Sequence, residues 1–238
     1  ILDVGRLTAS AHIPATRRPF GCEQVHQQLG LDTPIINYNG ALIHNRPRKL
    51  HLFHEPLAAQ TARAMVKCAR DIDPGVVVTI EVLDKCYTDH DDPKLQTETA
   101  KKFKPDYIGP LDVPLSDNIT KLMFLAPGAR LKAVRQAIMK EFAGMAAFME
   151  SDEHVMQIAH ADVSKGRALQ WVAASLGIPA ERCLAIGDAP NDSDMLRWAG
   201  KGCAVANAFG DARDAADVIL MEGNDNEAVG HAIEDYVL

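Results

Sequence analysis

The sequence has no run of about twenty consecutive apolar residues, which is the length that a membrane-spanning helix requires. It has no Cys-x-x-Cys pair, and its five cysteines are scattered, which favours reduced thiols over a disulfide framework. The nine histidines show no spacing typical of metal ligands. The first residues show no basic-then-apolar signal pattern. We therefore expect a soluble, cytoplasmic protein.

Positive charge is also scarce. The chain has 25 Lys and Arg against 32 Asp and Glu, a formal net charge of −7, and no basic block. This balance argues against a general affinity for nucleic acid or anionic membranes, although a small anionic substrate can still bind through local donors. With 238 residues, 47% of them hydrophobic, the chain is long enough for one large globular domain or two small ones.

An acidic loop directly follows one apolar run. Residues 183–186 are typical of a buried strand, and a glycine after them permits a tight turn into Asp188, Asn191 and Asp192. Carboxylate and amide oxygens at a strand end suit Mg²⁺. Taken alone, Asp192 or Ser193 is equally well explained as the N-cap of the next helix. The two interpretations are compatible.

The order of elements predicts two domains. Strands and helices alternate in residues 1–45 and 161–238, which predicts an α/β core domain with a doubly wound, parallel, Rossmann-like sheet. Residues 46–160 differ, because β-rich pieces are separated by two long amphipathic helices, at 57–70 and 129–142. This middle region is predicted to be an inserted α+β domain.

Polar residues recur where the strands of the predicted core end. Asp3, Thr16 and Asn39 each follow a short apolar segment, as Asp188 does. Doubly wound sheets bind ligands outside the carboxyl ends of their strands, so these side chains are expected to share one site. Singly, Thr16 fits an N-cap and Asn39 fits an ordinary turn.

Five motifs occur in a fixed order along the chain. They are Leu2-Asp3-Val4, Ala15-Thr16-Arg17-Arg18-Pro19, Asn39-Gly40-Ala41, Val163-Ser164-Lys165-Gly166 and Gly187-Asp188-Ala189-Pro190-Asn191-Asp192. Together they resemble the haloacid dehalogenase superfamily, and specifically the Cof-type phosphatases, which have a large C2-type cap domain inserted after the third strand. The resemblance extends over essentially the whole chain.

This resemblance implies a Mg²⁺-dependent phosphatase that acts on a small phosphorylated metabolite, such as a sugar phosphate. Asp3 aligns with the nucleophile that forms an aspartyl-phosphate, and Thr16 with a hydroxyl that binds a phosphoryl oxygen. Lys165 aligns with the cation that neutralises the phosphoryl oxygen and the nucleophile. Asp188 and Asp192 align with metal-binding carboxylates. The implied catalytic residues are therefore Asp3, Thr16 and Lys165.

The remaining implied roles concern binding. The phosphate-binding residues are Thr16, Arg18, Asn39, Lys165 and Asn191, and the metal-binding residues are Asp3, Asp188 and Asp192. Taken alone, a lysine before a helix is usually solvated, so the role of Lys165 depends on the resemblance. The family commonly has glycine where this chain has Arg17. The larger arginine side chain leaves less room for the backbone to approach a phosphate.

The chain departs from the family pattern near Asp3. The family has Asp-x-Asp-Gly-Thr, with the second aspartate as general acid and base, whereas Asp3-Val4 is followed by Gly5. Asp3 and Thr16 are also only thirteen positions apart, and a βαβ unit takes about thirty residues. We therefore expect the full protein to contain an Asp-x-Asp loop and a first helix at this point, in residues that are missing from this sequence.

If the stretch is complete, the chain would lack its acid and base. In that case the favoured alternative is a non-catalytic, phosphate-binding or regulatory protein with the same fold. Independently of this stretch, an enzyme that resembles a sugar phosphomutase is an alternative within the same fold.

Overall fold

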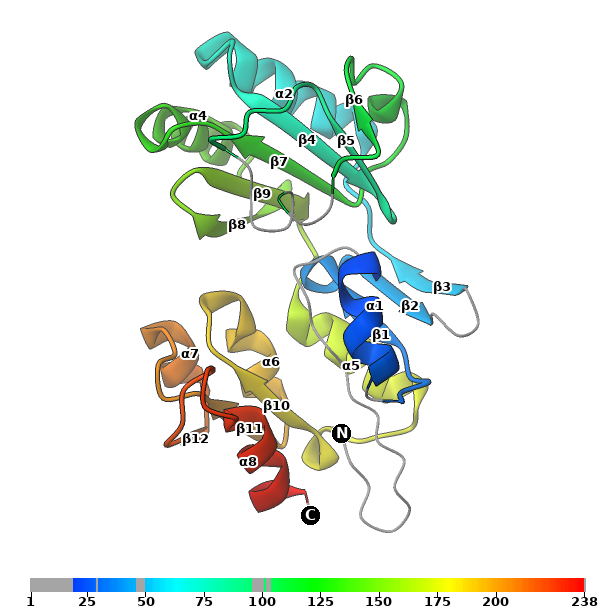
Figure 1. The fold of residues 1–238 in the computed structure, drawn as a ribbon, viewed down its shortest axis with the longest axis vertical. Coiled ribbons are helices and arrows are strands. Elements are labelled where there is room, and N and C mark those ends of the chain that lie inside the picture. The colour runs from blue at the N-terminus through cyan, green and yellow to red at the C-terminus, as the bar shows by residue number, and fades with distance from the viewer. Residues whose placement is uncertain (1–18, 29, 46–49, 96–100, 102–103, 238) are drawn as a thin grey trace. The chain divides into compact units, whose positions relative to one another are not determined.

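The structure is a computed structural model, and it describes all residues except 1–18, 29, 46–49, 96–100, 102–103 and 238 (Figure 1). Asp3, Thr16 and Arg18 therefore lie outside the described residues. The described chain forms two compact units. One contains residues 22–52 and 164–238, and the other contains residues 19–21 and 53–163.

The first unit contains elements from both ends of the chain. From the N-terminal side they are α1 (Pro19–Gln28), β1 (Ile35–Asn37), the short 3-10 helix η1 (Tyr38–Gly40), β2 (Leu42–Asn45) and β3 (Leu50–His54). From the C-terminal side they are α5 (Lys165–Ser175), η3 (Ala180–Arg182), β10 (Leu184–Gly187), η4 (Pro190–Asp192), α6 (Ser193–Trp198), β11 (Lys201–Ala204), α7 (Gly210–Ala215), β12 (Val218–Ile219) and α8 (Ala228–Tyr236).

A parallel sheet forms the centre of this unit. Its strands follow the order β10-β11-β12, with Ala185 opposite Gly202 and Cys203 opposite Val218. The alanines of α8 pack against buried side chains of this sheet, which gives it an apolar face. Strands joined by helices in this way confirm the predicted α/β class with a parallel core sheet. A second, antiparallel sheet follows the order β1-β2-β3.

The second unit is an α+β layer structure. Its elements are α2 (Ala59–Ile72), β4 (Val77–Val82), β5 (Lys85–Thr88), β6 (Tyr107–Ile108), η2 (Pro114–Ser116), β7 (Lys121–Leu125), α4 (Gly128–Glu141), β8 (Ala146–Asp152) and β9 (Val155–His160). The strands form one six-stranded sheet in the order β6-β5-β4-β7-β9-β8. Figure 1 shows both helices beside this sheet.

One continuous core joins the helices to the sheet. It includes Ala62, Met65, Val66 and Ala69 of α2, Leu131, Val134 and Ile138 of α4, and Val78, Ile80, Leu122, Phe124, Met156 and Ile158 of the strands. The strand residues alternate along the chain, so they all lie on one face of the sheet. Both helices therefore cover that same face.

The start of α2 differs from the predicted helix, which begins at residue 57. Leu57 and Ile119 instead exchange two backbone hydrogen bonds, of 2.8 and 3.0 Å, and form an antiparallel bridge. The helix can begin only after this bridge, at Ala59. Helical periodicity could not reveal the bridge, because the partner lies 62 positions away along the chain.

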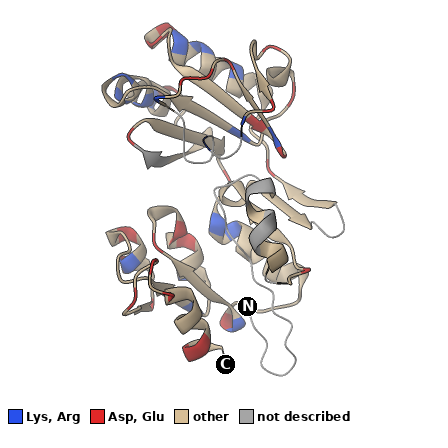
Figure 2. Ribbon diagram, viewed as in Figure 1, with Lys and Arg blue, Asp and Glu red and all other residues tan. Residues whose placement is uncertain are grey.

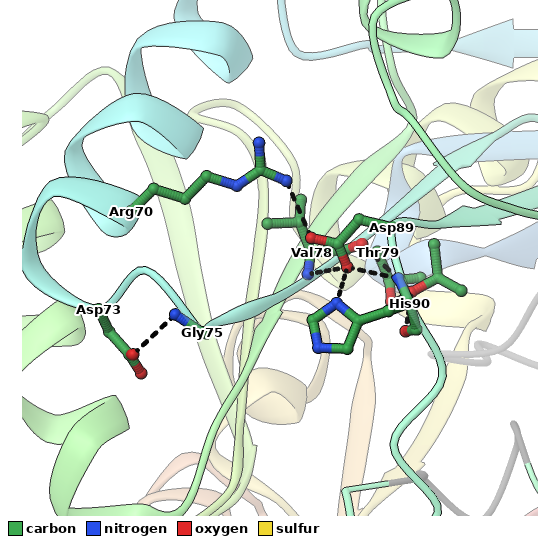
Figure 3. Close-up of polar contacts among 8 residues, drawn as sticks. Arg70, Asp73, Gly75, Val78, Thr79, Asp89 and His90 are labelled. Carbon is green, nitrogen blue, oxygen red and sulfur yellow. Dashed lines mark hydrogen bonds and ion pairs between the residues drawn. The ribbon is translucent and has the colours of Figure 1, made fainter.

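Asp89, just after β5, is the centre of a polar cluster (Figure 3). One carboxylate oxygen pairs with Arg70 of α2 at 2.9 Å, and the other accepts the backbone N–H groups of Val78 and His90 at 3.0 and 2.8 Å. The His90 ring also lies 2.9 Å from it. The Asp89 side chain therefore links the last turns of α2 to β4.

Replacing Asp89 by alanine is expected to lower the free energy of unfolding by about 2 kcal/mol, because the backbone donors lose a charged acceptor. Urea denaturation measures the change. The matched control is Asp71→Ala, whose ion pair with Lys67 lies in solvent and is expected to leave the unfolding midpoint unchanged. Equal effects of the two substitutions would contradict the assigned role of Asp89.

Charged residues are distributed unevenly among the described helices. Both signs of charge occur on α6 and α7, whereas α5 carries only Lys and Arg and α8 carries only Asp and Glu (Figure 2). None of the helices in the described part of the chain has both the length and the apolar character needed to cross a lipid bilayer.

Candidate active site

The acidic loop begins where β10 ends. Gly187 closes the strand, and a Cβ atom at this position would lie 2.5 Å from the Cβ atom of Asp192. Only glycine therefore lets the loop fold back on itself here. The Asp188 carbonyl accepts the Phe209 N–H at 2.8 Å, which links the loop to the segment before α7. The start of the loop is thus fixed by close packing at Gly187 and by this backbone hydrogen bond.

Asp192 is buried, with 3% of its surface exposed, and both of its carboxylate oxygens are engaged. Oδ2 accepts the backbone N–H groups of Asp188 and Ala189, each at 3.1 Å. Oδ1 lies 2.6 Å from Nζ of Lys165, which is also buried. The Asp192 side chain makes no capping hydrogen bond to α6, so the predicted N-cap role is wrong. The side chain instead shapes its own loop and holds a lysine.

Lys165 is the first residue of α5, and the neighbouring residues fix the start of that helix. The Ser164 side chain accepts the Arg167 N–H at 3.1 Å, a standard N-cap. Gly40 of η1 packs so closely that a Cβ atom there would overlap the Ser164 carbonyl oxygen. The Asn39-Gly40 and Ser164-Lys165 motifs, far apart in sequence, are therefore in contact.

Asn39 and Asn191 also meet. Nδ2 of Asn191 donates to Oδ1 of Asn39 at 3.0 Å. Tyr38 and Asn39 both have positive φ values, of 52° and 56°, which non-glycine residues seldom adopt. Such backbone strain persists where the surrounding structure enforces it, and it is frequent at functional sites. Here it positions the Asn39 side chain toward the acidic loop.

The Asp188 carboxylate differs from that of Asp192. It is half-buried, and it has no hydrogen bond or ion pair to any described residue. A carboxylate of this kind at the end of a strand suits a hard divalent cation. The described residues contain no group of three His, Cys, Asp or Glu side chains able to hold a metal ion. A magnesium site at Asp188 therefore needs a further ligand, and the predicted one, Asp3, lies outside the described residues.

The structure thus brings together five of the predicted residues: Asn39, Lys165, Asp188, Asn191 and Asp192. Asp3, Thr16 and Arg18 remain predictions. One contact was missed, in which the Asp194 carboxylate accepts the Gly166 N–H at 2.8 Å. A glycine directly after the lysine was the available signal, because glycine often marks a close approach of another group.

The cysteines nearest this loop in sequence are not candidate nucleophiles. Burial raises the pKa of the Cys183 and Cys203 thiols above the ordinary value. In the other unit, burial and a hydrogen bond to Glu141 raise the pKa of Cys68 to about 11. Thiolates are the reactive form of cysteine, so these three side chains are poor nucleophiles at neutral pH.

Comparisons with known proteins give a consistent result. The sequence profile of the family described as haloacid dehalogenase-like hydrolase matches residues 12–233. A 5-amino-6-(5-phospho-D-ribitylamino)uracil phosphatase of Bacillus subtilis is 26% identical over 93% of this chain and 83% of its own length. An HMP-PP phosphatase of Cronobacter sakazakii is 31% identical over 78% of this chain and 67% of its own length.

The fold has close counterparts among solved structures. A crystal structure of a haloacid dehalogenase-like hydrolase from Bacteroides thetaiotaomicron superimposes with a TM-score of 0.82. The match covers 94% of this chain and 85% of the other, at 22% sequence identity. At this level of identity, the likeness supports the fold alone.

Proposed function

The chain belongs to the haloacid dehalogenase-like hydrolases, and from that premise we propose that it is a Mg²⁺-dependent phosphatase that hydrolyses a small phosphorylated metabolite through an aspartyl-phosphate. It is a phosphoric monoester hydrolase, as the family and the phosphatases among its relatives indicate. The cytoplasm is its proposed location, which suits a chain whose five cysteines are all free thiols.

One observation carries the proposal: two neighbouring carboxylates, those of Asp188 and Asp192, differ in their hydrogen-bond partners. The Asp192 carboxylate accepts two backbone N–H groups and pairs with Lys165, whereas the Asp188 carboxylate makes no polar contact with any described residue. Asp188 is therefore the proposed direct ligand of Mg²⁺. Asp192 contributes through the lysine and the loop that it holds, because its oxygens are already occupied. Bound Mg²⁺ would neutralise negative charge between the carboxylates and the phosphoryl group.

Each residue then has a chemical task. A carboxylate oxygen of Asp3 attacks phosphorus, the bond from phosphorus to the ester oxygen breaks, and the leaving oxygen takes a proton from solvent water to give the alcohol. Water next cleaves the acyl phosphate, which releases inorganic phosphate and restores the Asp3 carboxylate. Lys165 supplies a positive charge at the transferred group, and Thr16 donates a hydrogen bond to it. Phosphoryl transfer needs little more than positioning and charge neutralisation, which these groups supply.

Arg18, Asn39 and Asn191 are the proposed additional phosphate-binding residues. The amide hydrogen bond between Asn39 and Asn191 supports this role, because it fixes both side chains beside the acidic loop. We assign the core domain to residues 1–45 and 161–238 and the inserted cap domain to residues 46–160. Substrate choice is proposed to reside in the cap, because the core motifs supply chemistry common to phosphate esters.

The proposal is tested by assaying the purified protein with p-nitrophenyl phosphate and Mg²⁺. We expect release of inorganic phosphate that stops when EDTA removes the metal and resumes when Mg²⁺ is restored. Phosphate binding without turnover would instead indicate a non-catalytic binding protein. Transfer of phosphate within a sugar phosphate, without its release, would indicate a mutase. Hydrolysis that persists fully in EDTA would contradict the metal-dependent mechanism.

A further inference from the structure

Two carboxylates after β10 contact the start of α5. Asp192 pairs with Lys165, and Asp194 makes the second contact. Its Oδ2 atom accepts the Gly166 N–H at 2.8 Å, and its Oδ1 atom accepts the N–H of Met195 at 2.9 Å. The second bond is local and fixes the direction of the carboxylate. The first spans 28 positions of sequence and reaches one of the amide groups that a helix leaves without an internal acceptor.

The approach of Asp194 requires the glycine. A Cβ atom at position 166 would lie 2.7 Å from Oδ2 of Asp194 and 2.8 Å from its Cγ atom. The backbone carbonyl carbon of Asp194 would also lie 2.8 Å away, and real Cβ atoms essentially never make contacts under 3.0 Å, so any other residue at 166 would displace the Asp194 main chain together with its carboxylate. The site is thus built for contact between a side-chain anion and a bare backbone amide.

The two contacts join consecutive residues at the start of α5, Lys165 and Gly166, to two carboxylates that lie two positions apart, Asp192 and Asp194. Asp192 holds the Lys165 ammonium at 2.6 Å, while Asp194 holds the amide of the next residue, Gly166. One contact restrains the end of a long side chain, and the other restrains the backbone from which it extends. A negative charge near the N-terminus of α5 is also stabilised by the helix dipole.

We propose that Asp194 is a positioning residue, which anchors the first turn of α5 so that Lys165 presents its ammonium group to the phosphoryl group. The inference rests on the proposed function and extends it to a residue that does not touch the substrate. Without the anchor, Asp192 still pairs with the ammonium, but the backbone at Lys165 can shift. Misplacement of a catalytic group by about 1 Å is enough to lower a rate markedly.

The first test is the kinetics of Asp194→Ala with p-nitrophenyl phosphate. We expect kcat to fall about tenfold with KM changed less than about threefold, because positioning matters most in the transition state. Gly166→Ala is expected to give a similar loss by the opposite route, since it displaces Asp194. Asp214→Ala, at an exposed position on α7, is the matched control and should retain the wild-type kcat.

A background without the lysine separates positioning from a general structural role. In Lys165→Met, the further change Asp194→Ala is expected to lower kcat less than about twofold, because the group that it positions is gone. Equal losses in both backgrounds would overturn the proposal. If Asp194→Ala does not fold, Asp194→Asn serves in both backgrounds. Its single amide oxygen can accept only one of the two N–H groups that the carboxylate accepts.

The wild-type protein is assayed first. Absence of turnover there would contradict the proposed function. Turnover in the wild type, with kcat unchanged in the folded Asp194 variant, would overturn only the role of Asp194.

Discussion

Replacing Asp192 by alanine is expected to lower the free energy of unfolding by about 3–5 kcal/mol and to abolish phosphatase activity. The substitution leaves the ammonium of Lys165 buried without a counter-charge, and the N–H groups of Asp188 and Ala189 without their acceptor. An uncompensated buried charge is among the largest single costs that a folded protein can incur. Urea denaturation and p-nitrophenyl phosphate kinetics measure the two effects separately.

A double substitution tests the explanation. In Lys165→Met combined with Asp192→Asn, no charge is left buried, and the amide oxygen can still accept the N–H groups of Asp188 and Ala189. We expect most of the lost stability to return while activity remains absent. Recovery of activity along with stability would show that the pair serves only the fold. A loss of less than about 1 kcal/mol in Asp192→Ala would contradict the buried pair itself.

The site shows how far sequence reasoning reaches. Parallel strands bring their carboxyl ends to one edge of a sheet, so Asp188 and its neighbours were predictable from the end of one apolar run. The order of the motifs then grouped Lys165 and Asn39 with these residues. In the structure Asp192 contacts Lys165 and Asn191 contacts Asn39, which agrees with that grouping. The prediction for Asp188 depended on its position at the end of a strand, whereas that for Lys165 depended on the resemblance in motif order.

Other features depended on contacts that periodicity does not encode. The sequence predicted both Asp188 and Asp192 at the metal, but it could not show that the Asp192 carboxylate pairs with Lys165 while the Asp188 carboxylate has no partner among the described residues. That difference is decided by rotamers and by the close packing that Gly187 permits. The bridge that delays the start of α2, and the contact of Asp194 with Gly166, also join segments far apart in sequence. Local patterns do not specify such pairings.

Asp188→Asn is expected to have the opposite profile from Asp192→Ala, with kcat lowered about a hundredfold or more and stability nearly unchanged. The Asp188 side chain has no polar partner among the described residues, so the amide costs the fold little. The proposed metal, however, loses a charged ligand. Activity measured across a Mg²⁺ titration should also show a higher half-saturating concentration.

Asp235→Asn, at an exposed position on α8, removes the same charge from the same unit and serves as the control. It should leave both kcat and the Mg²⁺ dependence unchanged. A residue whose loss removes activity without destabilising the fold is maintained for chemistry, whereas Asp192 is expected to serve both chemistry and fold. Wild-type Mg²⁺ dependence in Asp188→Asn would reject Asp188 as the metal ligand. In that case Asp192, despite its occupied oxygens, would have to exchange Lys165 for the ion.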